Sequence, residues 1–402
     1  MNILNCPVLM LPIALALSAC AHAPKGASHQ FNPVAQRGLP LVADFNVAEG
    51  NHTVSVTLGH PTLATATTVK AELRRLMLEN IHTLPGEYVT RSFTVNVRTP
   101  QITPVGAIAA GSVKLKDPRE TVDEARAWDG RLTLEFVGAL PALREVRIAP
   151  VVTPTLFLLG DSTVSDQAKE PYASWGQMLP RFFTSGIAVA NYAQSGESYR
   201  EAIARRRLDK VLSVMREGDT VVMQFGHNDQ KQQTDGKSGP YTTYKAEIKT
   251  MVTAIRARGG VPVIVSSMER RNFDAQGKIR PSLLDYADGA RQAAQELGAA
   301  FIDLNAISKP FYEALGPEGS RKAFAEPKPG QTDNTHHNNY GSYQLAKAIV
   351  TGLRTAKVPA ALFIADDAGV FDPTRPDPVA TFSLAASPGS TTQRPLGDET
   401  NK

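Results

Sequence analysis

The chain has 402 residues, of which 42% are hydrophobic and 20% are charged, and its formal net charge is +4. This length favours two domains over one, and the composition is ordinary for a globular protein. No basic run is longer than Arg205–Arg207. Nucleic acid is therefore not expected as a partner, because phosphate binding usually needs a clustered basic face.

The N-terminal residues predict export from the cytoplasm. Residues 9–17 form an apolar run too short to span a bilayer, and small residues follow it, as in a secretory signal. Residues 17–20, with the sequence LSAC, resemble the lipobox of bacterial lipoproteins, in which the cysteine is lipidated and becomes the new N-terminus. We therefore expect a signal peptide over residues 1–19 and a lipid on Cys20 that anchors the protein to the bacterial cell envelope, in the periplasm or at the cell surface.

Cleavage after Ala23, which would release a secreted protein, is the alternative. This alternative stays open because residues 1–5 contain no Lys or Arg, whereas the signal sequence that precedes a lipobox normally carries positive charge there. Both cysteines of the chain, Cys6 and Cys20, lie in this leader. We therefore expect no disulfide, no thiolate nucleophile and no Zn–S site in the mature protein.

A small, polar segment over residues 20–40 is expected to be a tether, and residues 41–152 then alternate between hydrophobic and polar positions. This period of two, interrupted by Gly, Pro and Asp, is typical of antiparallel strands and predicts a β-sandwich. The expected strands cover residues 52–58, 88–97, 111–115, 131–136 and 143–148. Glu49-Gly50-Asn51 indicates a hairpin between the first two strands.

This β-sandwich is expected to act as a scaffold rather than as a glycan-binding module. Glycan binding needs exposed aromatic rings that stack on sugars. The aromatic residues of this region are few, and the chief ones are Tyr88, Phe93, Trp128 and Phe136.

From residue 153 to residue 358, short apolar runs alternate with helical periodicity. The expected strands are residues 156–159, 187–192, 220–225, 261–266 and 300–304, and the expected helices are residues 200–216, 244–258, 282–297 and 341–355. Five such strands with crossover helices predict a doubly wound parallel sheet. Residues 359–402 are rich in Pro, Asp, Ser and Thr, so we expect them to lie over the surface and to be disordered from Pro388 onwards.

Four polar motifs come directly after expected strands or before the last expected helix. They are Gly160-Asp-Ser-Thr163, Asn191–Ser198, Gln224–Asp229 and Asp333-Asn-Thr-His336. In open α/β sheets ligands bind beyond the carboxyl ends of the strands, so these side chains are candidates for one site. Ser162 alone would be interpreted as a helix cap, but the four motifs together point to catalysis.

Together the motifs resemble the four sequence blocks of the SGNH (GDSL) hydrolases, over residues 155–355. The resemblance implies a flavodoxin-like, three-layer α/β/α hydrolase domain with a five-stranded parallel sheet, preceded here by the antiparallel β-sandwich. It also implies that Ser162 is the nucleophile and that His336 takes its proton. Asp333 would then hold the other nitrogen of the imidazole and stabilise the imidazolium.

The same resemblance implies an oxyanion hole, which is a set of donors for the charge that develops on the attacked carbonyl oxygen. Its donors would be the backbone N–H groups of Ser162 and Gly196 and the side-chain amide of Asn228.

His227 and His337 are expected to be packed neighbours rather than ligands. No metal is expected, because no His/Asp/Glu cluster outside residues 333–337 has ligand spacing.

Within this superfamily the chain is most similar to bacterial rhamnogalacturonan acetylesterases. The similarity is carried by GDSTV (160–164), SWGQ (174–177), QFGHNDQ (224–230), RRNFD (270–274), FYEAL (311–315) and DNTH (333–336). The chain departs from the family pattern at His337, where Phe is usual, and over residues 323–332, which are short for the group.

The expected function is therefore that of an exported serine esterase that removes O-acetyl groups from a polysaccharide, with pectic rhamnogalacturonan as the expected substrate and no cofactor. Arg200 and Arg207, which follow the Gly196 motif, are candidates to bind galacturonate carboxylates, with a solvated helix face as the alternative. Two other hypotheses stay open: a broad-specificity esterase or lipase for small or fatty esters, and a non-catalytic, carbohydrate-binding surface lipoprotein.

Overall fold

The computed structural model describes residues 26–35, 40–235 and 238–395. The predicted signal peptide, the lipidation of Cys20 and the alternative cleavage after Ala23 lie outside these residues, as does the end of the chain from residue 396. Among the helices that are described, none is both long and apolar enough to cross a membrane.

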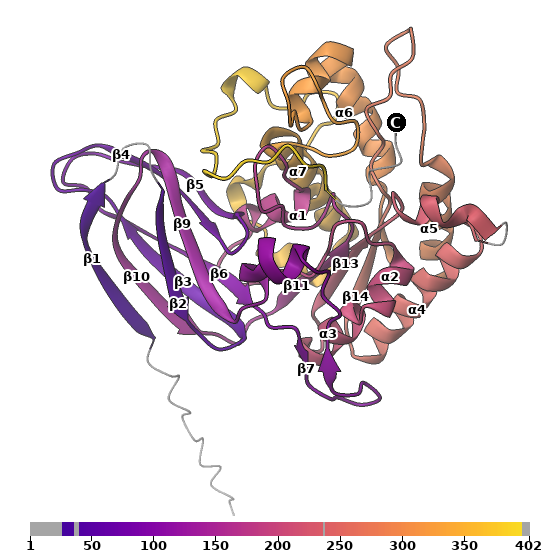
Figure 1. Ribbon diagram of the computed structural model, residues 1–402, viewed down its shortest axis with the longest axis horizontal. Helices are drawn as coiled ribbons and strands as arrows, with labels where there is room; N and C mark the ends of the chain where they lie inside the picture. The colour runs from indigo at the N-terminus through magenta and orange to yellow at the C-terminus, as the bar shows by residue number, and fades with distance from the viewer. Residues whose placement is uncertain (1–25, 36–39, 236–237, 396–402) are drawn as a thin grey trace, which may run out of the picture.

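Two antiparallel sheets of the N-terminal half pack face to face, on one side of the helices in Figure 1. One has the order β2-β9-β4-β5 and consists of Leu41–Asn46, Arg131–Leu140, Thr65–Ala71 and Arg75–Thr83. The other begins with β1-β10-β3-β6, which are Ala27–Ala35, Ala142–Pro150, Gly50–Leu58 and Val89–Val97. Alternate residues of β3 (Val54, Val56 and Leu58) point into the core between the sheets, as the period-two pattern predicts.

The structure corrects some details of this region. Glu49-Gly50-Asn51 does not form a hairpin, because β2 pairs with β9 whereas β3 pairs with β10 and β6. The chain instead crosses from one sheet to the other at residues 47–49. Strand β1 lies within the segment expected to be a tether and pairs with β10, and the hairpin of β4 and β5 was not predicted.

The aromatic side chains considered for glycan stacking are mostly buried. Phe93, Trp128 and Phe136 are 4%, 6% and 0% exposed. Tyr88 is half-buried, and the guanidinium of Arg144 lies 4.3 Å from the centre of its ring. These rings belong to the packing of the protein and are not free to stack on a sugar.

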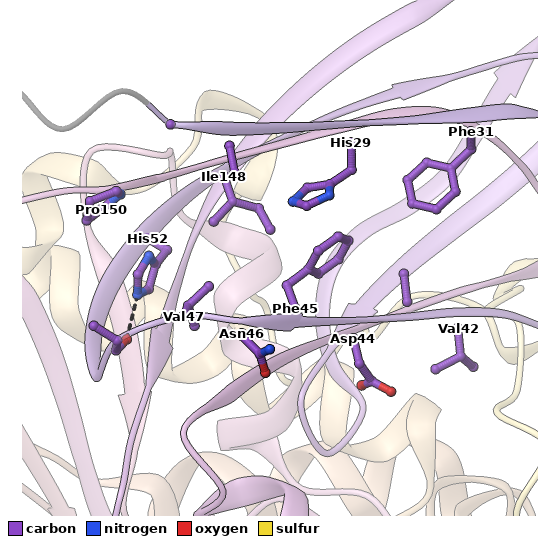
Figure 2. A pocket seen from close by; sticks show the side chains of 14 residues that line it. His29, Phe31, Val42, Asp44, Phe45, Asn46, Val47, His52, Ile148 and Pro150 are labelled. Atoms are coloured by element: carbon purple, nitrogen blue, oxygen red, sulfur yellow. Dashed lines mark hydrogen bonds between the residues drawn. The ribbon is translucent and has the colours of Figure 1, made fainter.

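A cavity of about 740 Å³ lies at the open edge of the sandwich, between β1 and β2. Figure 2 shows that His29 and Phe31 from β1 and Phe45 from β2 point toward each other across it. The rings of His29 and Phe45 are in contact, with centroids 4.7 Å apart. None of the predicted site residues lines this cavity.

The second half contains the predicted parallel sheet, in the order β12-β11-β13-β14-β15. These strands are Ala188–Asn191, Thr155–Gly160, Thr220–Gln224, Val261–Val265 and Ala300–Ile302. The seven α-helices of the described residues are α1 (Trp175–Met178), α2 (Tyr199–Ala204), α3 (Arg207–Val214), α4 (Thr243–Ala257), α5 (Leu284–Leu297), α6 (Leu304–Gly319) and α7 (Asn339–Ala356).

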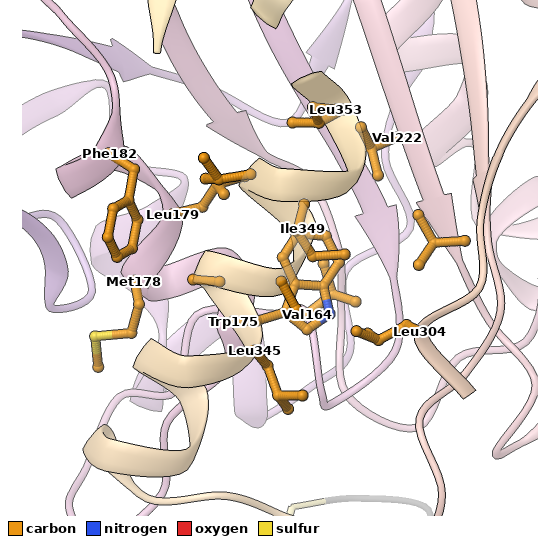
Figure 3. Packing of buried hydrophobic residues seen from close by; sticks show 14 of the residues in the cluster. Val164, Trp175, Met178, Leu179, Phe182, Val222, Leu304, Leu345, Ile349 and Leu353 are labelled. Atoms are coloured by element: carbon orange, nitrogen blue, oxygen red, sulfur yellow. The ribbon is translucent and has the colours of Figure 1, made fainter. Parts of the chain in front are cut away.

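Helices cover both faces of this sheet, which gives the predicted three layers. Side chains of β11 alternate between the faces: Leu156 and Leu158 pack with α1, α6 and α7, whereas Phe157 and Leu159 pack with α2 to α5. Figure 3 shows the first of these cores, where Trp175 of α1 and Ile349 of α7 meet. Because β11 is buried on both faces, its sequence is uniformly apolar rather than alternating.

The two halves of the chain share one sheet. Strand β6 of the sandwich lies parallel to β12, with Val95 opposite Val189. The full order is therefore β1-β10-β3-β6-β12-β11-β13-β14-β15. The domain boundary expected at residue 153 falls between β10 and β11, which are strands of this same sheet.

Two expected features of the C-terminal half differ in the structure. The helix expected over residues 200–216 is broken between α2 and α3, where Arg206 adopts the left-handed conformation with φ 64°. Residues 388–395, expected to be disordered, run along the surface, where the N–H of Glu170 donates to Gly389 O at 2.8 Å and the N–H of Thr391 donates to Glu170 O at 2.7 Å.

Candidate active site

Ser162 lies on the tight turn that follows β11. The side chain of Asp161 builds this turn, because its Oδ1 accepts hydrogen bonds from the N–H and the hydroxyl of Thr163, at 2.9 and 2.7 Å. Only glycine fits at position 160, since a Cβ there would meet Val164 Cγ2 at 2.5 Å and Gln224 O at 2.7 Å. Ser162 is 4% exposed.

The structure brings Ser162 together with His336 and Asp333. Nε2 of His336 lies 2.9 Å from Ser162 Oγ, and its Nδ1 lies 3.2 Å from Asp333 Oδ2. This arrangement suits a neutral imidazole that donates from Nδ1 to the carboxylate and accepts the serine proton at Nε2. The geometry is that of an activated serine nucleophile.

A short turn holds the carboxylate and the imidazole in place. Oδ1 of Asp333 accepts from the backbone N–H groups of Thr335 and His336, at 2.7 and 2.9 Å. Ala325 pairs with both ends of the turn: its N–H donates to His336 O at 2.9 Å and its carbonyl accepts from the N–H of Asp333 at 2.8 Å. Ala325 lies in the segment over residues 323–332, so this segment supports the turn directly.

The electrostatics favour an ionised Asp333. Burial alone would raise the pKa of its carboxyl, but the adjacent His336 and the hydrogen bonds to it hold that pKa well below its ordinary value. Arg394 adds a cation from the C-terminal segment, with its Nε 3.6 Å from Asp333 Oδ2. Tyr172 packs edge-on against the imidazole of His336, with ring centroids 5.8 Å apart.

His227 and His337 are packed neighbours, as expected. Nδ1 of His227 lies 3.3 Å from Asp161 Oδ2. His337 lies against Phe324, and its Nε2 is 2.8 Å from the hydroxyl of Tyr312. Burial, together with the nearby His336, lowers the pKa of His337 to about 3, so the ring is neutral, and its Nε2 shares a hydrogen bond with the Tyr312 hydroxyl.

The three predicted oxyanion donors lie on neighbouring loops. Gln167, which the sequence did not single out, joins two of these loops by donating to Ser162 O at 2.7 Å and to Ser195 Oγ at 3.2 Å. Nδ2 of Asn228 donates to the backbone carbonyl of Glu197 at 3.0 Å. Gly196, with φ 74°, occupies the left-handed region that glycine tolerates best.

The two backbone N–H groups predicted to form the oxyanion hole are free to bind a substrate oxygen. Within the part of the chain that the structure describes, the N–H groups of Ser162 and Gly196 have no hydrogen-bond acceptor. Ser162 is buried, and buried backbone N–H groups without a partner are rare in proteins, whereas Gly196 is half-buried. Such unpaired donors next to a serine hydroxyl are suited to receive a negatively charged oxygen.

The structure does not support Arg207 as a substrate-binding residue. Its side chain is 1% exposed, and its guanidinium is bonded to Glu197 at 2.7 Å and to Glu120 at 2.6 Å. A polymer therefore cannot reach it. Arg200 is half-exposed and donates to Glu247 Oε1 at 2.9 Å, so its contact with substrate stays a prediction.

No group of three or more His, Cys, Asp or Glu side chains among the described residues could hold a metal ion.

Comparisons with known proteins find relatives of the second half of the chain. The model of the GDSL-like Lipase/Acylhydrolase family matches residues 158–342. The rhamnogalacturonan acetylesterase RhgT of Bacillus subtilis (strain 168) is 36% identical over 214 residues, which cover 51% of this chain and 91% of that protein. The probable rhamnogalacturonan acetylesterase YesY of the same organism is 30% identical over 206 residues, covering 51% of this chain and 94% of that protein.

Among solved structures, the protein YxiM of Bacillus subtilis is 23% identical, with a TM-score of 0.48, and the match covers 79% of this chain and 80% of that one. The extent of the match to RhgT, which covers nearly the whole of that relative, places the hydrolase half in the same family. The chain therefore belongs to the GDSL-like lipase/acylhydrolase family and is a carboxylic ester hydrolase.

Proposed function

We propose that the protein is a serine acetylesterase that removes O-acetyl groups from a polysaccharide, with rhamnogalacturonan as the substrate. The observation that carries the proposal is the chain of contacts from Ser162 Oγ through His336 to Asp333, at 2.9 and 3.2 Å. The names of the relatives RhgT and YesY support the choice of substrate.

In the first step, Ser162 Oγ attacks the carbonyl carbon of the acetyl group while His336 Nε2 takes the serine proton. The tetrahedral intermediate collapses when the imidazolium gives this proton to the sugar oxygen, so that the sugar hydroxyl leaves and an acetyl group remains on Ser162. A water molecule, deprotonated by His336, then attacks the acetyl-enzyme and releases acetate, which restores the serine hydroxyl. Asp333 stabilises the imidazolium in both steps.

Negative charge develops on the acetyl oxygen in both tetrahedral intermediates. The N–H groups of Ser162 and Gly196 and the amide of Asn228 would receive it. One such donor contributes about 3 kcal/mol to lowering the barrier. The donors act on the transition state more than on the bound ester, because only there is the oxygen fully charged.

The nucleophile is tested by Ser162→Ala, with Ser165→Ala as a matched control. Both hydroxyls are buried, and Ser165 Oγ contacts Ser195 Oγ at 3.1 Å rather than His336. We expect Ser162→Ala to lower kcat for acetate release by about four orders of magnitude or more, and Ser165→Ala to retain most of it. A Ser162→Ala protein that kept a tenth of wild-type activity would rule out this nucleophile.

The substrate is tested by measuring acetate release from acetylated rhamnogalacturonan and acetylated xylan, together with aryl esters of increasing acyl length. An acetyl-sized pocket should reduce kcat/KM about a hundredfold from acetyl to butyryl, since each refused methylene costs about 1–3 kcal/mol. Equal release from both polymers would refute rhamnogalacturonan as the preferred substrate. Rates that stay flat with acyl length would indicate a broad-specificity esterase instead.

A further inference from the structure

We infer that Lys116, which comes from the N-terminal half, is a positioning residue for the oxyanion donor Gly196. Its ammonium holds the peptide group that carries the Gly196 N–H. This inference rests on the proposed serine-esterase mechanism. It also assigns a role in the reaction to a residue outside the span matched by the family model, residues 158–342.

The segment that carries Lys116 lies between β8 (Gly111–Ser112) and β9, and it includes two short helical turns, Arg119–Asp123 and Ala125–Ala127. In Figure 1 these turns, drawn in purple, lie beside β11 between the sandwich and the helices. The segment over residues 116–128 belongs to the N-terminal half by sequence but contacts the loop that follows β12.

The contact that carries the inference is a hydrogen bond of 2.6 Å from Lys116 Nζ to Ser195 O. The carbonyl of Ser195 and the N–H of Gly196 belong to the same peptide group, which is planar and trans. Fixing the direction of the carbonyl therefore fixes the direction of the N–H. An ammonium on the carbonyl also polarises the peptide and makes its N–H a stronger donor.

Neighbouring residues of the same segment hold the rest of this loop. Nη2 of Arg119 donates to Ser195 Oγ at 3.0 Å, and Gln194 Nε2 donates to Glu124 Oε2 at 2.9 Å. The residues immediately before Gly196 are thus bound through both main-chain and side-chain atoms.

The other side of Gly196 is held by a buried ion network. Glu197 is paired with Arg207 at 2.7 Å, and Arg207 is paired with Glu120 at 2.6 Å, with all three side chains at most 2% exposed. Trp128 Nε1 donates to the second oxygen of Glu120 at 3.0 Å. Gly196 therefore lies between two residues that are both connected to the segment over residues 116–128: Ser195 through Lys116, and Glu197 through Arg207 and Glu120.

The test is the kinetics of Lys116→Met on an aryl acetate, where polymer binding plays no part. The variant keeps the length of the side chain but removes the ammonium. We expect kcat to fall at least about tenfold with little change in KM, because an oxyanion donor acts mainly in the transition state. Lys116→Arg, which keeps a charged donor, should restore much of kcat, and Lys116→Gln, with a neutral donor, should lie between them.

Lys245→Met is the matched control. Lys245 is also half-buried, and its ammonium donates to Gln292 at 3.2 Å and to Glu296 at 2.5 Å across α4 and α5, away from the Gly196 loop. The Lys245→Met variant should retain the wild-type kcat. Its melting temperature should change by about as much as that of Lys116→Met. If Lys116→Met does not fold, Lys116→Gln provides the same comparison.

The outcomes separate the inference from the proposed function. If Ser162→Ala is inactive but Lys116→Met and Lys116→Gln turn over at the wild-type rate, or lose activity only through KM, the role of Lys116 is refuted and the serine mechanism stands. If Ser162→Ala remains active, the mechanism itself fails.

Discussion

His337 occupies a position where the resemblance to the acetylesterases predicts Phe, and its surroundings explain how a histidine is accommodated there. The hydroxyl of Tyr312, a residue that is 0% exposed, is hydrogen-bonded to Nε2 of His337 at 2.8 Å. The histidine therefore provides the partner that a buried phenol requires, which a phenylalanine could not do. The imidazole of His337 lies one residue from His336, the proposed base, and its low pKa keeps it from competing with His336 for the serine proton.

His337→Phe should destabilise the protein at neutral pH by about 1–3 kcal/mol, because the Tyr312 hydroxyl would be left buried and unpaired. The double variant with Tyr312→Phe should recover most of that loss, since both polar partners are then gone. Urea unfolding of the wild type, the two single variants and the double variant measures this coupling. Additive effects in the double variant would contradict the hydrogen bond.

The pH dependence of stability should also change in His337→Phe. The folded state holds the pKa of His337 at about 3, whereas an unfolded histidine has a pKa of about 6.5. Between these values only the unfolded state binds the proton, so this group destabilises the wild type as pH falls below about 6.5. The free energy of unfolding should therefore fall less steeply in the variant than in the wild type as the pH is lowered. Equal slopes of unfolding free energy against pH in the two proteins would refute the lowered pKa of His337.

At the scale of elements, the turn between β4 and β5 docks the sandwich onto the loop that follows Ser162. Nε of Arg75 donates to Asp166 Oδ2 at 2.7 Å, and Nη1 of Arg74 donates to the carbonyls of Gln167 and Tyr172, both at 3.0 Å. The backbone of Arg74 has φ 62°, a value that non-glycine residues rarely adopt. The docking contacts offset the cost of that conformation.

Arg75→Met should cost about 3–5 kcal/mol of stability, because it leaves the Asp166 carboxylate buried without its cation. The double variant with Asp166→Asn should be more stable than Arg75→Met alone. Arg147→Met is the control, since the pair of Arg147 with Glu145 is exposed on the arginine side (67%), and solvent screening leaves such pairs with little effect on stability. Equal losses of unfolding free energy in Arg75→Met and Arg147→Met would contradict the docking role.

At the scale of the whole molecule, the N-terminal half and the hydrolase half are joined by one continuous sheet and by two sets of buried polar contacts. One set comes from the turn of residues 72–75 and the other from residues 116–128. The N-terminal half therefore supports the loops that carry the candidate site residues. We expect the two halves to unfold together, as one cooperative unit.

We also propose that the whole protein is anchored to the bacterial cell envelope by a lipid on Cys20. Cys20→Ala should abolish lipidation and move the mature protein from the membrane fraction to the soluble fraction, because stable anchoring requires more than one acyl chain. Fractionation and the mass of the mature N-terminus measure this. Wild-type protein that is soluble and begins at residue 24 would support cleavage after Ala23 instead.

The sequence by itself determined the parallel sheet and the residues that the structure brings together in the candidate site. An apolar strand is recognisable locally, since burial on both faces leaves no room for polar residues. Ser162, Gly196, Asn228 and His336 each lie in a short motif at a strand end or before a helix, so their position could be predicted without the tertiary structure, and the resemblance of the four motifs to the SGNH hydrolases implied their roles. The sandwich was also predicted from a local pattern: strands that are buried on one face alternate between hydrophobic and polar residues with a period of two.

Only the tertiary structure decided what supports that site. The bond of Lys116 to Ser195 joins residues 79 positions apart, and that of Arg75 to Asp166 joins residues 91 apart. Neither contact leaves a periodic signal, because the sequence around a charged side chain does not show which carboxylate or carbonyl will satisfy it. The burial of Arg207 was missed for the same reason: a charged residue is expected in solvent, and only the fold brings Glu120 and Glu197 to it.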